Sequence, residues 1–153
     1  MFFKKKPKKV FEDYFSEIQA DMVDICLEYA ENYADMIYIY CSYEHNVLAT
    51  DVFYKINGTC LRKHKLNEAP GEHPEYTTSI DNQKIVVRTL MDDLHKIIDL
   101  FKTYQRPTPT QMKLFYNPKT GSFNADYEYE PVYTNLPDKT ADDVLEDWII
   151  AES

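Results

Sequence analysis

Residues 122–130, Ser-Phe-Asn-Ala-Asp-Tyr-Glu-Tyr-Glu, alternate between small or aromatic and polar side chains, and this alternation constrains the fold most strongly. Successive side chains of a β-strand point to opposite faces of its sheet. A strand here therefore places four residues toward a core: Phe123, Ala125, Tyr127 and Tyr129. Its other face is polar and mostly acidic, formed by Asn124, Asp126, Glu128 and Glu130. We predict that Tyr127 and Tyr129 support the sheet from its core side.

The acidic face has two interpretations. Carboxylates on alternate positions repel one another, and a sheet face needs only polar residues, not acidic ones, to remain in water. A cationic partner would remove that repulsion. The simpler interpretation is a solvated outer face that happens to be acidic.

Further β-rich segments indicate the rest of the sheet. Three of them, joined by Glu44-His45-Asn46 and by the hairpin signal Asn57-Gly58, predict an antiparallel meander over residues 36–43, 47–56 and 59–66. Residues 111–116 and 122–129 predict a hairpin across Asn-Pro-Lys-Thr-Gly. Residues 67–79, which contain two prolines and a glycine, predict a surface loop.

Apolar residues at three- and four-residue spacing predict two long amphipathic helices, over residues 11–31 and from Asp81 or Asn82 to about Tyr104. Residues 141–151 predict a short C-terminal helix with Trp148 on its apolar side. The order of elements predicts an α+β domain over residues 11–153. It consists of a single antiparallel sheet, a three-strand meander plus a hairpin, packed with the two long helices and the short one.

Charge is unevenly distributed along the 153 residues, whose net charge is −9. Five lysines give residues 1–10 a charge of +5, so the remaining 143 residues carry −14. We predict that this basic segment is a flexible arm. A second acidic group follows the strand, at Asp142, Asp143, Glu146 and Asp147. The acidic field disfavours nucleic acid and membrane surfaces as partners and favours basic proteins.

Cysteine usage indicates a reducing compartment. The three cysteines are odd in number, widely spaced and set in apolar segments, so we predict buried, unpaired thiols at Cys26, Cys41 and Cys60. The sequence contains neither the apolar run of a signal peptide nor one of transmembrane length. We therefore expect a cytoplasmic protein.

Catalytic motifs are nearly absent. The three glycines fall in turns or loops, so the sequence offers no phosphate-binding loop. The four histidines lack His-x-x-x-His spacing, and no serine stands in a Gly-x-Ser-x-Gly elbow. We expect no enzymatic activity, no cofactor and no metal ion.

Four segments resemble the YezG-type antitoxin family: Ile37-Tyr38-Ile39-Tyr40, Asp-Val-Phe-Tyr-Lys-Ile-Asn-Gly at 51–58, the helical run at 90–102, and residues 119–129. The resemblance covers about residues 11–150, and its Gly-x-Phe-x-x-Asp-Tyr-x-Tyr-like block is its most specific part. Members are cytoplasmic immunity proteins that neutralise secreted bacterial toxins, notably nucleases exported by the type VII route. Immunity families that resemble the SUKH group also use acidic α+β domains.

The resemblance implies a cytoplasmic immunity protein whose partner is a cognate secreted toxin, a nuclease with a basic active-site surface. Charge complementarity predicts that the two acidic groups bind it: Asn124, Asp126, Glu128 and Glu130, then Asp142, Asp143, Glu146 and Asp147. Two alternatives remain open. One is an acidic adaptor or regulator of another basic protein, and the other is a small enzyme with a carboxylate–histidine site assembled in space.

Overall fold

Five antiparallel strands form one sheet in the order β3-β2-β1-β4-β5. The strands span Met36–Glu44 (β1), Val47–Ile56 (β2), Thr59–Arg62 (β3), Gln111–Tyr116 (β4) and Phe123–Glu128 (β5). The computed structural model describes residues 8–153, so most of the predicted basic arm lies outside the described residues. The meander, the hairpin and the α+β fold class are confirmed.

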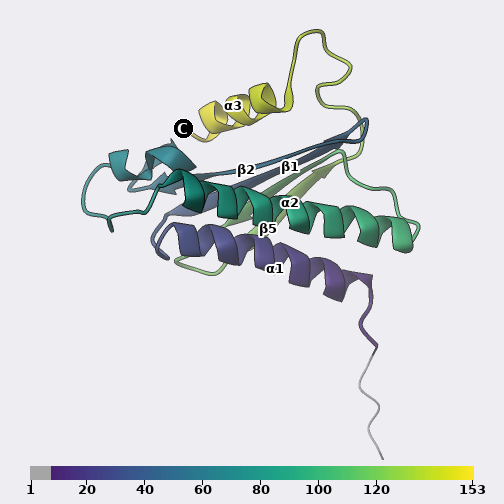
Figure 1. Ribbon diagram of the computed structural model, residues 1–153, viewed down its shortest axis with the longest axis horizontal. Helices are drawn as coiled ribbons and strands as arrows, with labels where there is room; N and C mark the ends of the chain where they lie inside the picture. The colour runs from purple at the N-terminus through teal and green to yellow at the C-terminus, as the bar shows by residue number, and fades with distance from the viewer. Residues whose placement is uncertain (1–7) are drawn as a thin grey trace, which may run out of the picture.

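Helices cover both faces of the sheet. The long helices α1 (Phe11–Tyr29) and α2 (Ile80–Thr103) lie on one face, and the short helix α3 (Ala141–Glu152) lies on the other (Figure 1). The two faces hold separate apolar cores. The larger core joins α1 and α2 to the sheet, and the smaller one joins α3 to Tyr38, Tyr40 and Phe53.

The helix starts follow from capping chemistry. The Ser79 hydroxyl accepts a hydrogen bond of 3.2 Å from the Asn82 backbone N–H, so α2 begins one residue before the predicted Asp81. Thr140 and Asp143 form a reciprocal capping box at the start of α3. Asn57 and Gly58 have φ values of 50° and 83°, as the tight turn between β2 and β3 requires.

The third strand is shorter than predicted. We expected residues 59–66, whereas β3 ends at Arg62 and a 3-10 helix, η1, continues over Lys63–Glu68. Leu66 is fully buried in the larger core, and the Lys63 carbonyl accepts a 2.7 Å hydrogen bond from the Tyr29 hydroxyl. These contacts turn the chain toward α1, and so His64 lies on a helical turn instead of a strand.

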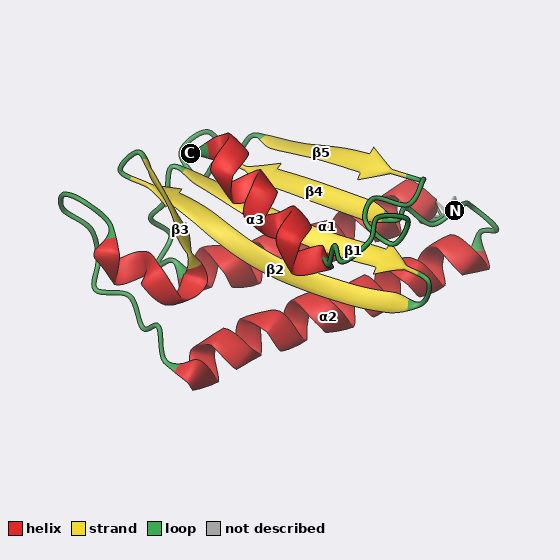
Figure 2. Cartoon of the chain, turned by 90° about the horizontal axis from the view of Figure 1, so that it is seen from above, coloured by secondary structure: helices red, strands yellow, loops and turns green. Residues whose placement is uncertain are grey.

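The short helix α3 covers part of the second face of the sheet, as the predicted packing of a short C-terminal helix on the sheet requires. Figure 2 shows α3 crossing over the middle of the sheet while β5 stays uncovered at its edge. Trp148 explains the position of α3, because its ring packs edge-on against the rings of Tyr38, Phe53 and Phe115 at 5.0–5.7 Å. The β5 margin of this face is left to solvent.

Candidate functional site

The hairpin between β4 and β5 places the predicted acidic residues on an edge strand. We call Asn124, Asp126, Glu128 and Glu130 the acidic strand surface. Cross-strand pairing sets the first three opposite Phe115, Lys113 and Gln111 of β4, on the side of the sheet that carries α3. All four are exposed, and none forms an ion pair within residues 8–153. Asn124, Asp126 and Glu128 thus form one row on β5, and the exposed Glu130 follows it two residues after the strand ends.

Of the two tyrosines predicted to support the core, only Tyr127 packs against it. Tyr127 packs on the core side, where its ring centroid lies 5.9 Å from that of Phe15 and its hydroxyl accepts a 2.8 Å hydrogen bond from Gln19. Tyr129 is 52% exposed, so the prediction that it supports the core is wrong. The strand has already ended at Glu128, and the chain beyond it is not held in the alternation of the sheet.

Thr110 fixes the chain where β5 ends. Its backbone N–H donates to the Glu128 carbonyl at 2.8 Å, and its hydroxyl donates to the Glu130 carbonyl at 2.7 Å. These bonds use backbone oxygens and leave both carboxylates free. The last two acidic side chains of the acidic strand surface are therefore presented from a fixed backbone.

Lys113 is the cation nearest in the sheet to the acidic strand surface. It lies directly opposite Asp126, and its ammonium is 5.0 Å from the centre of the Trp148 ring. Such a cation–π contact holds the ammonium on the α3 side of the pair. The acidic strand surface therefore has one cation, opposite Asp126, beside its three carboxylates, and it retains a net negative charge.

The acidic residues of α3 already have partners within the chain. Asp142 and Glu146 both form ion pairs with Arg62 of β3, the first at 3.4 Å. Asp147 pairs with Lys139 at 3.0 Å, and Asp143 belongs to the capping box, whose hydrogen bonds lower the pKa of its carboxyl. The ion pairs occupy carboxylates of α3, and the capping box fixes the start of the helix. Sequence reasoning missed this role, and the capping pattern Thr-x-x-Asp was the available signal.

Glu44 ties the segment that joins β5 to α3. It is buried at 3% exposure, and its carboxylate accepts hydrogen bonds from the Thr134 hydroxyl at 2.8 Å and from two backbone N–H groups. Burial opposes ionisation here, but these donors prevail and hold the pKa of Glu44 below its usual range. The linking segment is thereby anchored between the acidic strand surface and α3.

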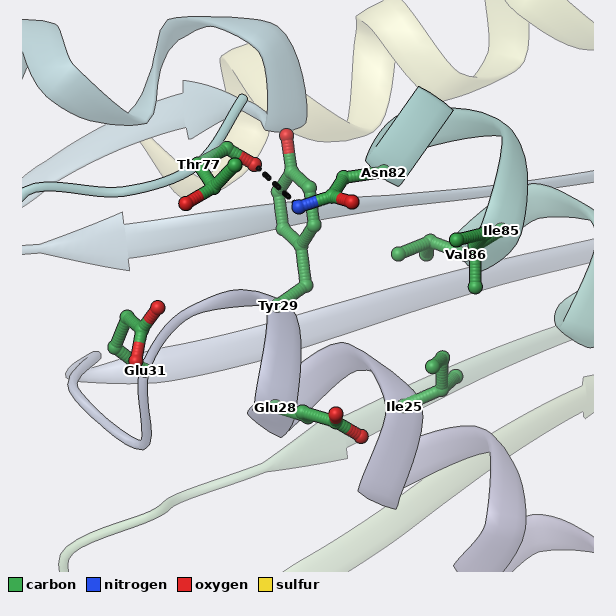
Figure 3. Close-up of a pocket in the computed structure, with 8 residues that line it drawn as sticks. All are labelled: Ile25, Glu28, Tyr29, Glu31, Thr77, Asn82, Ile85 and Val86. Atoms are coloured by element: carbon green, nitrogen blue, oxygen red, sulfur yellow. Dashed lines mark hydrogen bonds between the residues drawn. The ribbon is translucent and has the colours of Figure 1, made fainter. Parts of the chain in front are cut away.

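The cleft between the two long helices has no catalytic arrangement of side chains, whereas a second cavity of about 240 Å³ is lined by Cys60, His64, Glu68 and Glu146. The cleft in Figure 3, about 290 Å³ in volume, lies between the end of α1 and the start of α2. The Tyr29 hydroxyl binds the Lys63 carbonyl, and the Asn82 amide binds the Thr77 carbonyl at 3.3 Å. Glu28 and Glu31 complete the polar lining, which contains no imidazole or thiol. Within residues 8–153, no histidine is hydrogen-bonded to a carboxylate.

Residues 8–153 lack two further kinds of feature. No three or more histidine, cysteine, aspartate or glutamate side chains lie close enough together there to hold a metal ion. In the same residues, none of the helices is long and apolar enough to cross a membrane.

Comparison with known proteins identifies no family. No protein-family model matches the chain, and no functionally described protein is significantly similar to it.

Proposed function

We propose that this chain is a cytoplasmic immunity protein that binds a cognate secreted bacterial toxin and blocks it stoichiometrically. The toxin has a basic surface, as a nuclease requires in order to bind its phosphate substrate. The observation that carries the proposal is the exposed acidic strand surface with its carboxylates Asp126, Glu128 and Glu130, which lack ion pairs within the described chain. A fixed row of like charges is costly for an isolated protein and useful to one that meets a cation.

Two further features support a protein-binding role. Tyr129 is exposed between Glu128 and Glu130, and tyrosine is enriched at protein interfaces because its ring adds contact area at a low cost in conformational entropy. The chain's net charge of −9 would also accelerate encounter with a basic partner. We place the primary contact on the acidic strand surface, with the partly neutralised carboxylates of α3 beside it.

The test combines toxin neutralisation with binding kinetics. The probe is the protein encoded by the neighbouring gene, produced with and without the immunity protein, and the readouts are cell survival and nuclease activity in vitro. The triple variant Asp126→Asn, Glu128→Gln, Glu130→Gln should fold normally, since it changes only exposed side chains. Its association rate at low salt should fall by roughly tenfold and lose much of its salt dependence.

A matched control removes the same number of charges elsewhere. Glu28, Glu75 and Asp99 are exposed and form no ion pair within residues 8–153, so the variant Glu28→Gln, Glu75→Gln, Asp99→Asn equalises the net charge. It should retain most of the association rate. Failure of the unaltered protein to protect cells or inhibit the neighbouring gene's product would refute the immunity function and favour an adaptor for another basic protein.

A further inference from the structure

The outer edge of β5 has free backbone hydrogen-bonding groups. Among the described strands β5 pairs only with β4. The bond of 2.9 Å from the Asn117 N–H to the Ser122 carbonyl fixes the phase of this ladder, because bonded pairs recur at every second residue of an antiparallel pair. The backbone groups of Asn124, Asp126 and Glu128 therefore point toward β4. Those of Phe123, Ala125 and Tyr127 point outward, away from the sheet.

The two sides of this edge differ in chemistry. On the α3 side lie the carboxylates of Asp126 and Glu128. On the α1 side, the end of the hairpin borders a mainly apolar groove of about 300 Å³. Its lining includes Ala20, Val23 and the 40% exposed ring of Phe123, together with the polar residues Ser16, Gln19 and Asp24. A strand added at this edge would alternate its side chains between the two sides. Its residues on one side would meet carboxylates, and those on the other would meet mainly apolar atoms.

We propose that β5 binds its partner by strand addition, and that the added segment is an extended stretch of another protein in which basic and apolar residues alternate. Main-chain hydrogen bonds to Phe123, Ala125 and Tyr127 supply affinity, as in other sheet-edge recognition. The acidic strand surface and the groove select the side-chain pattern of the added segment. This inference deepens the proposed function, because it specifies how the acidic strand surface holds a basic toxin.

Charge repulsion disfavours the pairing of this edge with β5 of a second copy of the chain. Pairing β5 with β5 places the Asp126 and Glu128 side chains of both copies on one face of the joined sheet. Like charges at neighbouring cross-strand positions destabilise a sheet. A basic strand instead places lysine or arginine at those positions and neutralises the row. Charge therefore selects a foreign strand over self-association.

Nuclear magnetic resonance provides the direct test. The probe is a peptide of the same length as β5 with alternating lysine and valine, and the control peptide has the same composition with the lysines grouped together. Near nine-tenths saturation, solvent exchange of the outward amides of Phe123, Ala125 and Tyr127 should slow by up to about tenfold, because only the free fraction still exchanges. The inward amides of Asn124, Asp126 and Glu128 should change much less.

A pair of variants separates edge pairing from charge attraction. Ala125→Pro removes one outward N–H at a position where an edge strand tolerates proline, and Ala125→Val retains that N–H. Both variants are first checked for a native thermal transition. The proline variant should bind the alternating peptide at least several-fold more weakly than the valine variant; equal affinities would overturn strand addition.

The other outcomes are equally decisive. Absence of peptide binding, or binding without protection of the outward amides, would overturn strand addition. So would equal binding of the grouped peptide, or the same protection appearing without peptide as a concentration-dependent dimer. None of these results decides the outcome of the neutralisation assay, because that assay tests the immunity function separately. Protection of the three outward amides by the alternating peptide alone would support the proposal.

Discussion

Asp93 is a buried carboxyl group that opposes the stability of the fold when it is ionised. It lies on α2 at 2% exposure, and its Oδ2 atom has no hydrogen-bond partner within residues 8–153. Burial, reinforced by Asp21 of α1, raises the pKa of Asp93 to about 7. Lys96, whose ammonium lies 3.8 Å from Oδ1, acts in the opposite direction but does not outweigh burial.

We expect Asp93→Asn to stabilise the protein in a pH-dependent manner. The pKa of Asp93 in the folded protein, about 7, lies above the ordinary aspartate value of 3.8. The cost of ionisation is therefore absent in acid, grows as pH rises from about 4 to 7, and stays constant above that. The substitution should therefore raise the free energy of unfolding near pH 8 by up to about 4 kcal/mol and change it little near pH 4. Urea unfolding at both pH values, with Asp92→Asn as the exposed control, measures this. An equal effect at the two pH values would contradict it.

At the scale of elements, α3 is held by one large side chain. Trp148 is 4% exposed and packs on rings from β1, β2 and β4. Arg62 adds ion pairs along the β3 side of the helix, but these are largely exposed to solvent and contribute little on their own. The attachment of α3 consequently depends on aromatic packing.

We expect Trp148→Ala to cost about 3–5 kcal/mol in the free energy of unfolding, as truncation of a buried aromatic residue usually does. Ile150→Ala is the control on the same helix, because Ile150 is 66% exposed and should cost little when truncated. Denaturant unfolding followed by circular dichroism compares the two variants. Similar losses for both would show that α3 does not pack as described.

Some elements could be predicted from the sequence because their signals are local. The alternation of residues 123–128 specifies a strand, and Asn57-Gly58 specifies a tight turn. The structure confirms both the strand and the turn. The end of β3 could not be predicted, because Leu66 leaves the strand in order to fill a core formed by distant segments. The position of α3 also depends on tertiary packing. One sequence signal did indicate that a helix covers the second face. The apolar run in β1 is nearly unbroken, which is typical of a strand buried on both faces.

The same distinction between local signals and long-range packing applies to the candidate site. The exposure of Asp126 and Glu128 follows from the period of the strand, and it is confirmed. The pairing of Asp142 and Glu146 with Arg62 was not predictable, because Arg62 is separated from them by 80 and 84 residues in sequence. Local patterns thus locate charges, whereas long-range pairing determines which of them remain available to a partner.

For the whole molecule, the two cores divide the cysteines into two classes. Cys26 and Cys41 lie in the larger core at no more than 1% exposure, and burial raises the pKa of both thiols. Cys60, near α3, is only partly buried, so the prediction of burial holds less well for it. All three are unpaired.

We expect thiol labelling of the native protein to modify Cys60 first. Cys26 and Cys41 should react only when the larger core opens, at a rate governed by unfolding of that core. In denaturant all three should react quickly. Mass spectrometry of a labelling time course distinguishes the sites. Equal native rates at the three cysteines would be inconsistent with the two-core arrangement.

The contact between Lys113 and Trp148 gives the molecule an optical reporter. Trp148 is the only tryptophan in the chain, so its fluorescence is assigned without mutagenesis. A cation 5.0 Å from its ring lies in the sheet directly opposite Asp126. A ligand that occupies the acidic row and displaces that ammonium would alter the electric field at the indole and so shift its emission. The structure therefore connects the outer strand to a signal that can be followed in the unlabelled protein.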